Sequence, residues 1–181
     1  MNSTSASESP PLAEPLAISF SADLFTAPHA VRAFKQRLKV QNDILKQHYH
    51  PQRSVNALLT MKSDAIDTLL RCTWQHFLGD HAEHLSLLAV GGYGRRELFP
   101  HSDIDIVILL QADIDRLQHQ QALSNFSTFL WDIGLKPGQS VRTLAECTQA
   151  AIDDQTIITG LLEHRLITGN IGLHNAIHDA T

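Results

Sequence analysis

Two short apolar segments separated by a glycine-rich turn form the most constraining part of the sequence. Residues 88–110 read LAVGGYGRRELFPHSDIDIVILL. The apolar runs 85–90 and 104–110 are each bounded by turn residues, which predicts two buried strands. Because buried strands need other elements to cover them, the chain is expected to combine a sheet with helices.

Helical periodicity surrounds these strands. We predict helices over 28–49, 54–78, 115–133 and 154–168, a third strand over 139–142, and a helix start at the capping box Thr143–Glu146. The predicted fold class is α+β, a small mixed sheet with helices. It divides into a disordered tail 1–16, a helical segment 17–84, a core 85–145 and a helical segment 146–181.

Two carboxylates open the second predicted strand. Side chains two apart on a strand share a face, so Asp103 and Asp105 point to one side, while Ile104, Ile106 and Ile108 point into the core. Like charges this close are unfavourable unless a cation lies between them, and Mg²⁺ takes oxygen ligands of this kind. The Asp-Ile-Asp sequence alone also fits an exposed strand with a solvated polar face.

The glycine turn, residues 91–94 (GGYG), lets backbone N–H groups approach an anion closely. It is neither a Walker loop, because no Gly-Lys-Ser/Thr follows, nor a GxGxxG motif, because Glu97 stands in the last glycine position. A hairpin turn with surface arginines and a capping serine is the alternative. The candidate nucleotide-binding residues are Gly91, Gly92, Gly94, Arg95, Arg96 and Ser102.

Composition excludes several other classes of protein. The net charge of −5 argues against a chain that grips nucleic acid, and no apolar run approaches the roughly 18 residues of a membrane helix. The N-terminus lacks the features of a signal peptide, and Cys72 and Cys147 are expected to be reduced thiols of a cytoplasmic protein. Three histidines near the end of the second helix are interpreted as surface residues: His76, His81 and His84.

The glycine turn after the first predicted strand and the two aspartates at the second together resemble the motif of the polymerase-beta-type nucleotidyltransferase superfamily. The residues that fall on the motif are Gly91, Gly92, Ser102, Asp103 and Asp105. Three further stretches narrow the resemblance, namely LWDIGL at 130–135, GQSVRT at 138–143 and LEHRLITG at 162–169. With them the chain resembles the N-terminal part of bacterial protein-PII uridylyltransferase/uridylyl-removing enzymes.

This resemblance implies a polymerase-beta-like core that transfers UMP from UTP to a tyrosine of the PII nitrogen-signalling protein. It also implies that Asp103 and Asp105 bind catalytic Mg²⁺, and that the chain stops before the HD and ACT domains of the family. Two alternatives stay open: an ATP-using nucleotidyltransferase of the same superfamily, and a non-catalytic module that binds nucleotide or a partner.

One feature departs from the superfamily pattern. Many members carry a third acid on a later strand, but the predicted strand 139–142 has none. Arg142 on that strand is expected either to reach a phosphate or to form a buried ion pair. Glu163 and Arg165 are expected to form a structural pair on the last predicted helix.

Overall fold

The computed structural model describes residues 18–48 and 54–181. The predicted tail 1–16 lies outside these residues. A four-stranded mixed sheet in the order β3-β2-β1-β4 forms the centre. Its strands are β1 (Leu85–Ala89), β2 (Asp105–Leu110), β3 (Gly138–Thr143) and β4 (Arg165–Gly169). β1 lies antiparallel to β2 and β4, whereas β2 and β3 are parallel.

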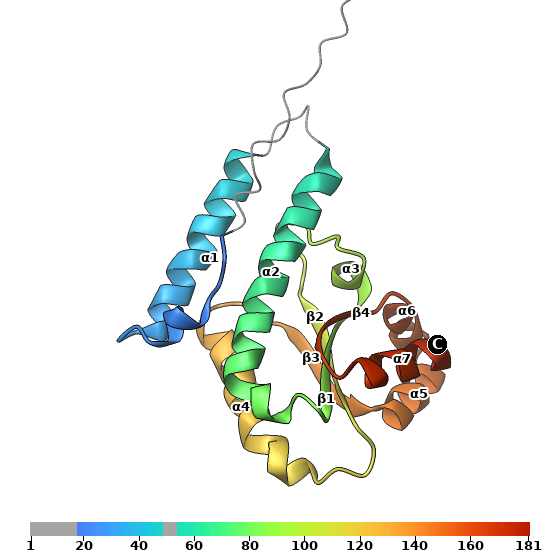
Figure 1. Cartoon of the computed structure of the whole chain (residues 1–181). Helices are drawn as coiled ribbons and strands as arrows, with labels where there is room; N and C mark the ends of the chain where they lie inside the picture. Colours follow the sequence, from blue (N-terminus) through green and yellow to red (C-terminus); the bar gives the residue numbers. More distant parts are fainter. Residues whose placement is uncertain (1–17, 49–53) are drawn as a thin grey trace, which may run out of the picture.

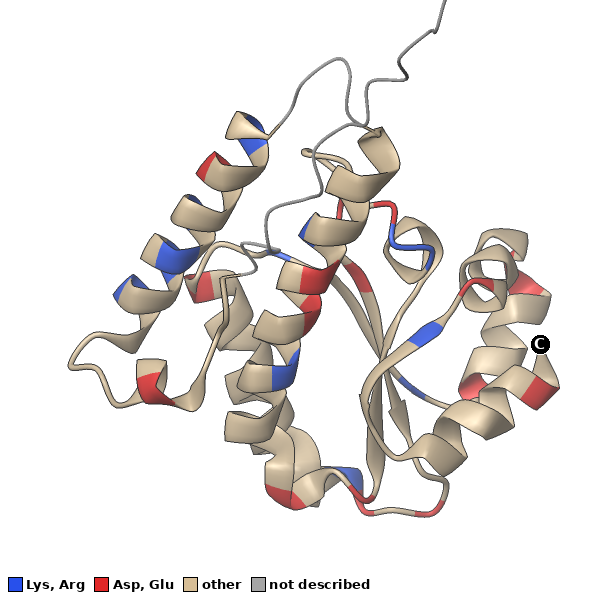
Figure 2. Ribbon diagram, turned by 45° about the horizontal axis from the view of Figure 1, so that its top comes forward, with Lys and Arg blue, Asp and Glu red and all other residues tan. Residues whose placement is uncertain are grey.

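Helices cover both faces of this sheet (Figure 1 and Figure 2). They are α1 (Ala30–Gln47), α2 (Val55–Leu78), α3 (Gly91–Gly94), α4 (Arg116–Asp132), α5 (Leu144–Asp153), α6 (Gln155–Leu162) and α7 (Ile171–Ala180). Short 3₁₀ turns span Ala22–Phe25 and Gly79–His81. The predicted α+β architecture with a small mixed sheet is therefore confirmed.

Alternation along β2 divides the core into two layers. Ile106 and Ile108 pack with the helices α1, α2 and α4, whose core residues include Phe34, Trp74 and Phe126. Val107 and Leu109 face the opposite way, into a smaller cluster formed with α5, α6 and α7. Asp105 shares the second face, because side chains two apart on a strand point in the same direction.

Most predicted elements are confirmed with small shifts at their ends. The helix predicted over 28–49 is α1, the one over 54–78 is α2, and the one over 115–133 is α4. Tyr49, at the end of the first prediction, lies outside the described residues. The capping box at Thr143 is present, since its hydroxyl accepts from Glu146 N and the Glu146 carboxylate accepts from Thr143 N.

Only the first half of the helix predicted over 154–168 is confirmed, as α6 (Gln155–Leu162). The second half is wrong, because residues 165–169 form β4, which pairs with β1. Ile167 is buried in the larger cluster while Leu166 packs against the smaller one, so β4 contributes to both layers of the core. Pairing with a distant strand overrides the local helical pattern here. Glu163 and Arg165 consequently do not share a helix.

Candidate nucleotide-binding site

Asp105 stands where a buried strand reaches solvent. It is exposed at the start of β2, while the five residues that follow it are buried. The parallel strand β3 places Gly138 beside it. A Cβ on Gly138 would lie 2.4 Å from Asp105 Oδ1, so the missing side chain leaves the space that this carboxylate occupies.

The second carboxylate lies close enough to affect the first. Asp103 is exposed, in the segment just before β2. The prediction that both aspartates lie on one strand is therefore wrong, because β2 begins only at Asp105. Burial raises the pKa of Asp105, and the negative charge of Asp103 raises it further. A carboxylate with a raised pKa next to a second carboxylate is a place where a cation would be favourable.

The glycine turn forms the short helix α3, which directly follows β1. A hydrogen bond of 3.1 Å from Val90 N to Asp105 O joins the start of α3 to the start of β2. Gly91 has a φ of +55°, a left-handed conformation that favours glycine. Gly94 N makes the first intrahelical bond, to Val90 O, so the N–H groups of the preceding turn have no intrahelical acceptor. Such N–H groups suit an anion.

The other two glycines of the motif have different surroundings. A Cβ on Gly94 would lie 1.9 Å from the backbone oxygen of Glu163, so this glycine allows the turn to pack against the segment between α6 and β4. Gly92 is less confined, since the nearest atom to its Cβ position is Glu97 O at 3.7 Å.

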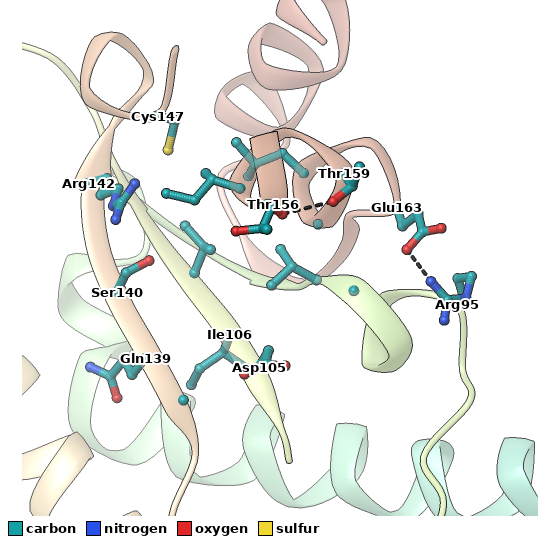
Figure 3. Close-up of a pocket in the computed structure, with 17 residues that line it drawn as sticks. Arg95, Asp105, Ile106, Gln139, Ser140, Arg142, Cys147, Thr156, Thr159 and Glu163 are labelled. Atoms are coloured by element: carbon teal, nitrogen blue, oxygen red, sulfur yellow. Dashed lines mark hydrogen bonds and ion pairs between the residues drawn. The ribbon is translucent and has the colours of Figure 1, made fainter. Parts of the chain in front are cut away.

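A pocket of about 630 Å³ lies between the glycine turn, the β2–β3 pair and α6 (Figure 3). This volume is in the usual range for small-molecule sites. β3 contributes one wall and α6 the facing one. The residues that line the pocket include Val90, Gly91, Arg95, Asp105, Gln139, Ser140, Arg142, Cys147, Thr156, Thr159 and Glu163.

Of the predicted nucleotide-binding residues, Gly91 and Arg95 line the pocket, and so does the predicted metal ligand Asp105. Gly92, Gly94 and Asp103 do not line it. Arg96 does not either: it ion-pairs with Asp64 on α2.

Ser102 serves the turn before β2. Its hydroxyl accepts a hydrogen bond from Phe99 N at 3.1 Å, and it does not line the pocket. This is the capping role considered as the alternative in the sequence.

The two pocket arginines differ in their partners. Arg95 binds the carboxylates of Glu97, at 2.8 Å, and of Glu163. Among the described residues, no carboxylate lies within ion-pair distance of Arg142. Arg142 is half-buried, and its charge lowers the pKa of the Cys147 thiol, although burial raises that pKa more. The positive charge in this part of the pocket is therefore available to a ligand.

Sequence reasoning had found only part of this wall. The two-residue period of β3 indicated that Ser140 and Arg142 share a face, and both line the pocket. Thr156 and Thr159 had no such signal, because their place depends on how α6 packs over the sheet. On β3, the face shared with Asp105 carries Gly138, Ser140 and Arg142, so no third acid stands there.

The carboxylate oxygens at this site fit a hard cation that is held partly by the protein and partly by phosphate oxygens. Within residues 18–48 and 54–181, no group of three or more His, Cys, Asp or Glu side chains is arranged to hold a metal by itself. Mg²⁺, however, is usually held by one or two carboxylates together with substrate phosphates. Asp105 lines the pocket beside the glycine turn, and Asp103 is close enough to raise its pKa, so the two carboxylates could supply the protein ligands of such an ion.

Of the three histidines predicted to lie at the surface, His76 is exposed, and His81 and His84 are partly exposed. His76 stacks on Phe25, with ring centroids 3.8 Å apart, and His81 Nδ1 lies 3.0 Å from Nδ1 of His119. His84 Nδ1 lies 3.0 Å from Gln111 Oε1.

In the described part of the chain, no helix is both long and apolar enough to cross a membrane.

The glycine turn and Asp105 at the start of β2 meet in one pocket, the arrangement expected of a nucleotidyltransferase. Residues 35–146 match the DUF294 nucleotidyltransferase domain, and the chain belongs to this family.

Its relatives include proteins named bifunctional uridylyltransferase/uridylyl-removing enzyme. The chain is 39% identical over 162 residues to the one from Pseudomonas putida strain W619, and 40% and 38% identical to those from Pseudomonas entomophila strain L48 and Stutzerimonas stutzeri strain A1501. The matches cover 90% of this chain and 18% of each relative. The chain therefore spans less than a fifth of the length of these relatives.

Proposed function

We propose that this nucleotidyltransferase chain transfers UMP from UTP to a tyrosine hydroxyl of a PII signalling protein in a Mg²⁺-dependent reaction. The observation that carries the proposal is the meeting of the glycine turn and Asp105 in one pocket. The relatives named uridylyltransferases support UTP as the donor. PII as the acceptor comes from the sequence resemblance to the PII-modifying enzymes.

In this proposal the pocket residues bind and orient the triphosphate. The N–H groups at the start of α3 and the Arg95 guanidinium contact phosphate oxygens. Asp103 and Asp105 would hold Mg²⁺, which when bound neutralises charge at the phosphates. Arg142, whose charge has no carboxylate partner among the described residues, contacts a further phosphate oxygen, and Ser140 contacts the remainder of the nucleotide along β3. The tyrosine oxygen of the acceptor bonds to the α-phosphorus as the bond to the leaving pyrophosphate breaks, and the phenolic proton is lost to water.

A label-transfer assay tests this function. The chain is incubated with PII, Mg²⁺ and UTP labelled at the α-phosphate, and the label on PII is counted. We expect Asp105→Asn and Asp103→Asn each to reduce transfer by at least about 100-fold, because each removes a ligand charge at the reacting phosphates. Asp132→Asn is the matched control, since Asp132 is exposed on α4 and does not line the pocket.

The donor is tested by calorimetry with UTP and ATP. Tighter binding of ATP than of UTP would contradict the uridylyl proposal and favour the ATP-using alternative. Equal transfer by wild type and by both aspartate variants would contradict a catalytic role for this pocket.

A nucleotide-binding module without transferase activity is the second candidate. The observation that favours it is the face of β3, where glycine, serine and arginine stand in place of a third acid. In that case the chain would bind UTP with Mg²⁺, Asp105→Asn would weaken that binding, and PII would remain unlabelled. Labelled PII would exclude this candidate.

A further inference from the structure

The position of the glycine turn needs support from outside the turn itself. α3 has four residues, which is too short for a helix to be stable by itself. Gly91 at its start and Arg96 just after its end have φ values of +55° and +63°. Left-handed backbone at a residue such as Arg96 persists only where surrounding contacts hold it.

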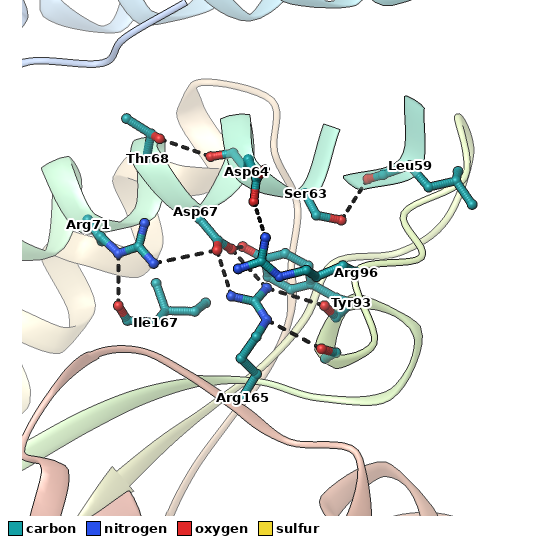
Figure 4. Close-up of polar contacts among 11 residues, drawn as sticks. Leu59, Ser63, Asp64, Asp67, Thr68, Arg71, Tyr93, Arg96, Arg165 and Ile167 are labelled. Carbon is teal, nitrogen blue, oxygen red and sulfur yellow. Dashed lines mark hydrogen bonds and ion pairs between the residues drawn. The ribbon is translucent and has the colours of Figure 1, made fainter. Parts of the chain in front are cut away.

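Those contacts come from α2 (Figure 4). Asp67 on α2 is 1% exposed, and its Oδ1 accepts a hydrogen bond of 2.6 Å from the hydroxyl of Tyr93, the buried residue in the middle of the turn. Asp64, three residues earlier on the same helix face, pairs with Arg96. α2 therefore contacts both the middle and the end of the glycine turn.

Arg165 completes this buried cluster from β4. Its guanidinium donates to both oxygens of Asp67, at 2.6 and 3.0 Å, and to the backbone oxygens of Tyr93 and Gly94 at 3.4 and 3.3 Å. It also lies 5.4 Å from the centre of the Tyr93 ring. One buried carboxylate thus joins α2, the glycine turn and β4.

The protonation state of the tyrosine fits this arrangement. Burial and the neighbouring Asp67 charge raise the pKa of Tyr93 well above its usual value, so the hydroxyl stays protonated and donates a hydrogen bond to Asp67. Arg71, whose guanidinium lies 3.5 Å from Asp67, adds a second positive charge to this carboxylate. None of Asp67, Tyr93 and Arg71 lines the pocket, so any effect on a ligand must pass through the turn.

We propose that Asp67 is a positioning residue for the nucleotide. Through Tyr93 and Arg165 it fixes the glycine turn relative to Asp105, so that the N–H groups of the turn and the carboxylate act on the same triphosphate. This inference rests on the proposed function and adds to it a group outside the pocket on which nucleotide affinity depends.

Tyr93→Phe is the test variant, because it removes the hydrogen bond to Asp67 and keeps the buried ring. Replacing Asp67 itself would leave Arg165 buried without its partner and endanger folding. Ser63→Ala is the matched control. Ser63 is also buried on α2, and its hydroxyl donates to Leu59 O at 2.9 Å, within the helix and away from the turn.

Two measurements compare these variants. Calorimetry with UTP and Mg²⁺ should show Kd rising about tenfold in Tyr93→Phe, as expected for the loss of a buried hydrogen bond to a charged group. In the transfer assay KM should rise more than kcat falls. Hydrogen exchange, measured without nucleotide, should become about tenfold faster at the amides of residues 94–97. Ser63→Ala should leave Kd and these amides unchanged.

The outcomes separate the two proposals. If wild type binds UTP and Tyr93→Phe binds it equally well, the positioning role is refuted and the proposed function stands. If exchange at residues 94–97 is the same in Tyr93→Phe and Ser63→Ala, the support of the turn by Asp67 is refuted, whatever the nucleotide. If wild type binds no UTP, both the proposed function and the nucleotide role of Asp67 are refuted.

Discussion

Gly138 offers a way to move the Asp105 carboxylate without changing its chemistry. The two residues lie side by side in the parallel pair of β2 and β3. Gly138→Ala adds one methyl group, whose ideal position is 2.4 Å from Asp105 Oδ1 and 3.6 Å from its carboxyl carbon. The nearby atoms within 4 Å all belong to this side chain.

The expected displacement follows from these distances. Ordinary contact begins near 3.4 Å, so the carboxylate oxygen must move by about 1.0 Å. Asp105 is exposed at the strand end, so it moves by rotating its side chain rather than by shifting the backbone. We therefore expect little loss of thermal stability. A displacement of about 1 Å at a reacting centre reduces catalysis by about 100-fold, and that is the fall expected in kcat/KM for UMP transfer.

Gly160→Ala is the matched control for this prediction. Gly160 lines the same pocket from α6, and a Cβ there meets nothing within 4 Å. Alanine is also favoured over glycine in a helix, by about 1 kcal/mol, so this variant should be as stable as wild type or more so, and as active. The reasoning is refuted if Gly138→Ala retains wild-type transfer while Asp105→Asn abolishes it, or if both glycine variants lose activity equally.

Three further predictions concern charge and packing. The pKa of Asp105 is raised in the folded protein, so this carboxyl stabilises the fold most when it is protonated, below its unfolded pKa of about 3.9, and that stabilisation is lost as the pH rises through the folded pKa. Asp105→Asn should therefore raise Tm at pH 7 and lose that advantage near pH 3, as measured by thermal unfolding. Arg142→Gln should weaken UTP binding in calorimetry by about tenfold, with unchanged Tm, because no described carboxylate pairs with it. Gly94→Ala should destabilise the chain by about 1–3 kcal/mol in urea unfolding, because its Cβ would overlap the Glu163 backbone; an unchanged midpoint would contradict the packing described here.

Short-range periodicity accounts for most of what could be predicted about the fold. Short apolar runs bounded by turn residues identified β1 and β2, the third strand was also predicted, and the spacing of apolar residues identified α1, α2 and α4. The exception, β4, is a five-residue strand whose stability comes from pairing with β1, about 80 residues away. A local pattern does not contain that pairing, which explains the helix predicted in its place.

The acidic strand and the glycine turn could be read from the sequence because their chemistry depends on neighbours within a few residues. The two aspartates stand next to a buried apolar run, although only Asp105 lies on β2, and glycines after a buried strand permit a tight turn. The roles of the arginines could not be read this way. Arg95 and Arg96 are adjacent in sequence, yet one lines the pocket and the other pairs with Asp64 on α2.

By itself, the sequence determined the class of fold and the position of the glycine turn and the two aspartates, since strand patterns and turn chemistry are local properties. Only the tertiary structure decided which of those residues share a pocket. It placed α6 opposite β3, set Gly138 against Asp105, and brought Asp67 and Arg165, 98 residues apart, together at Tyr93 beneath the glycine turn. Such contacts depend on how whole elements pack, and no short stretch of sequence specifies them.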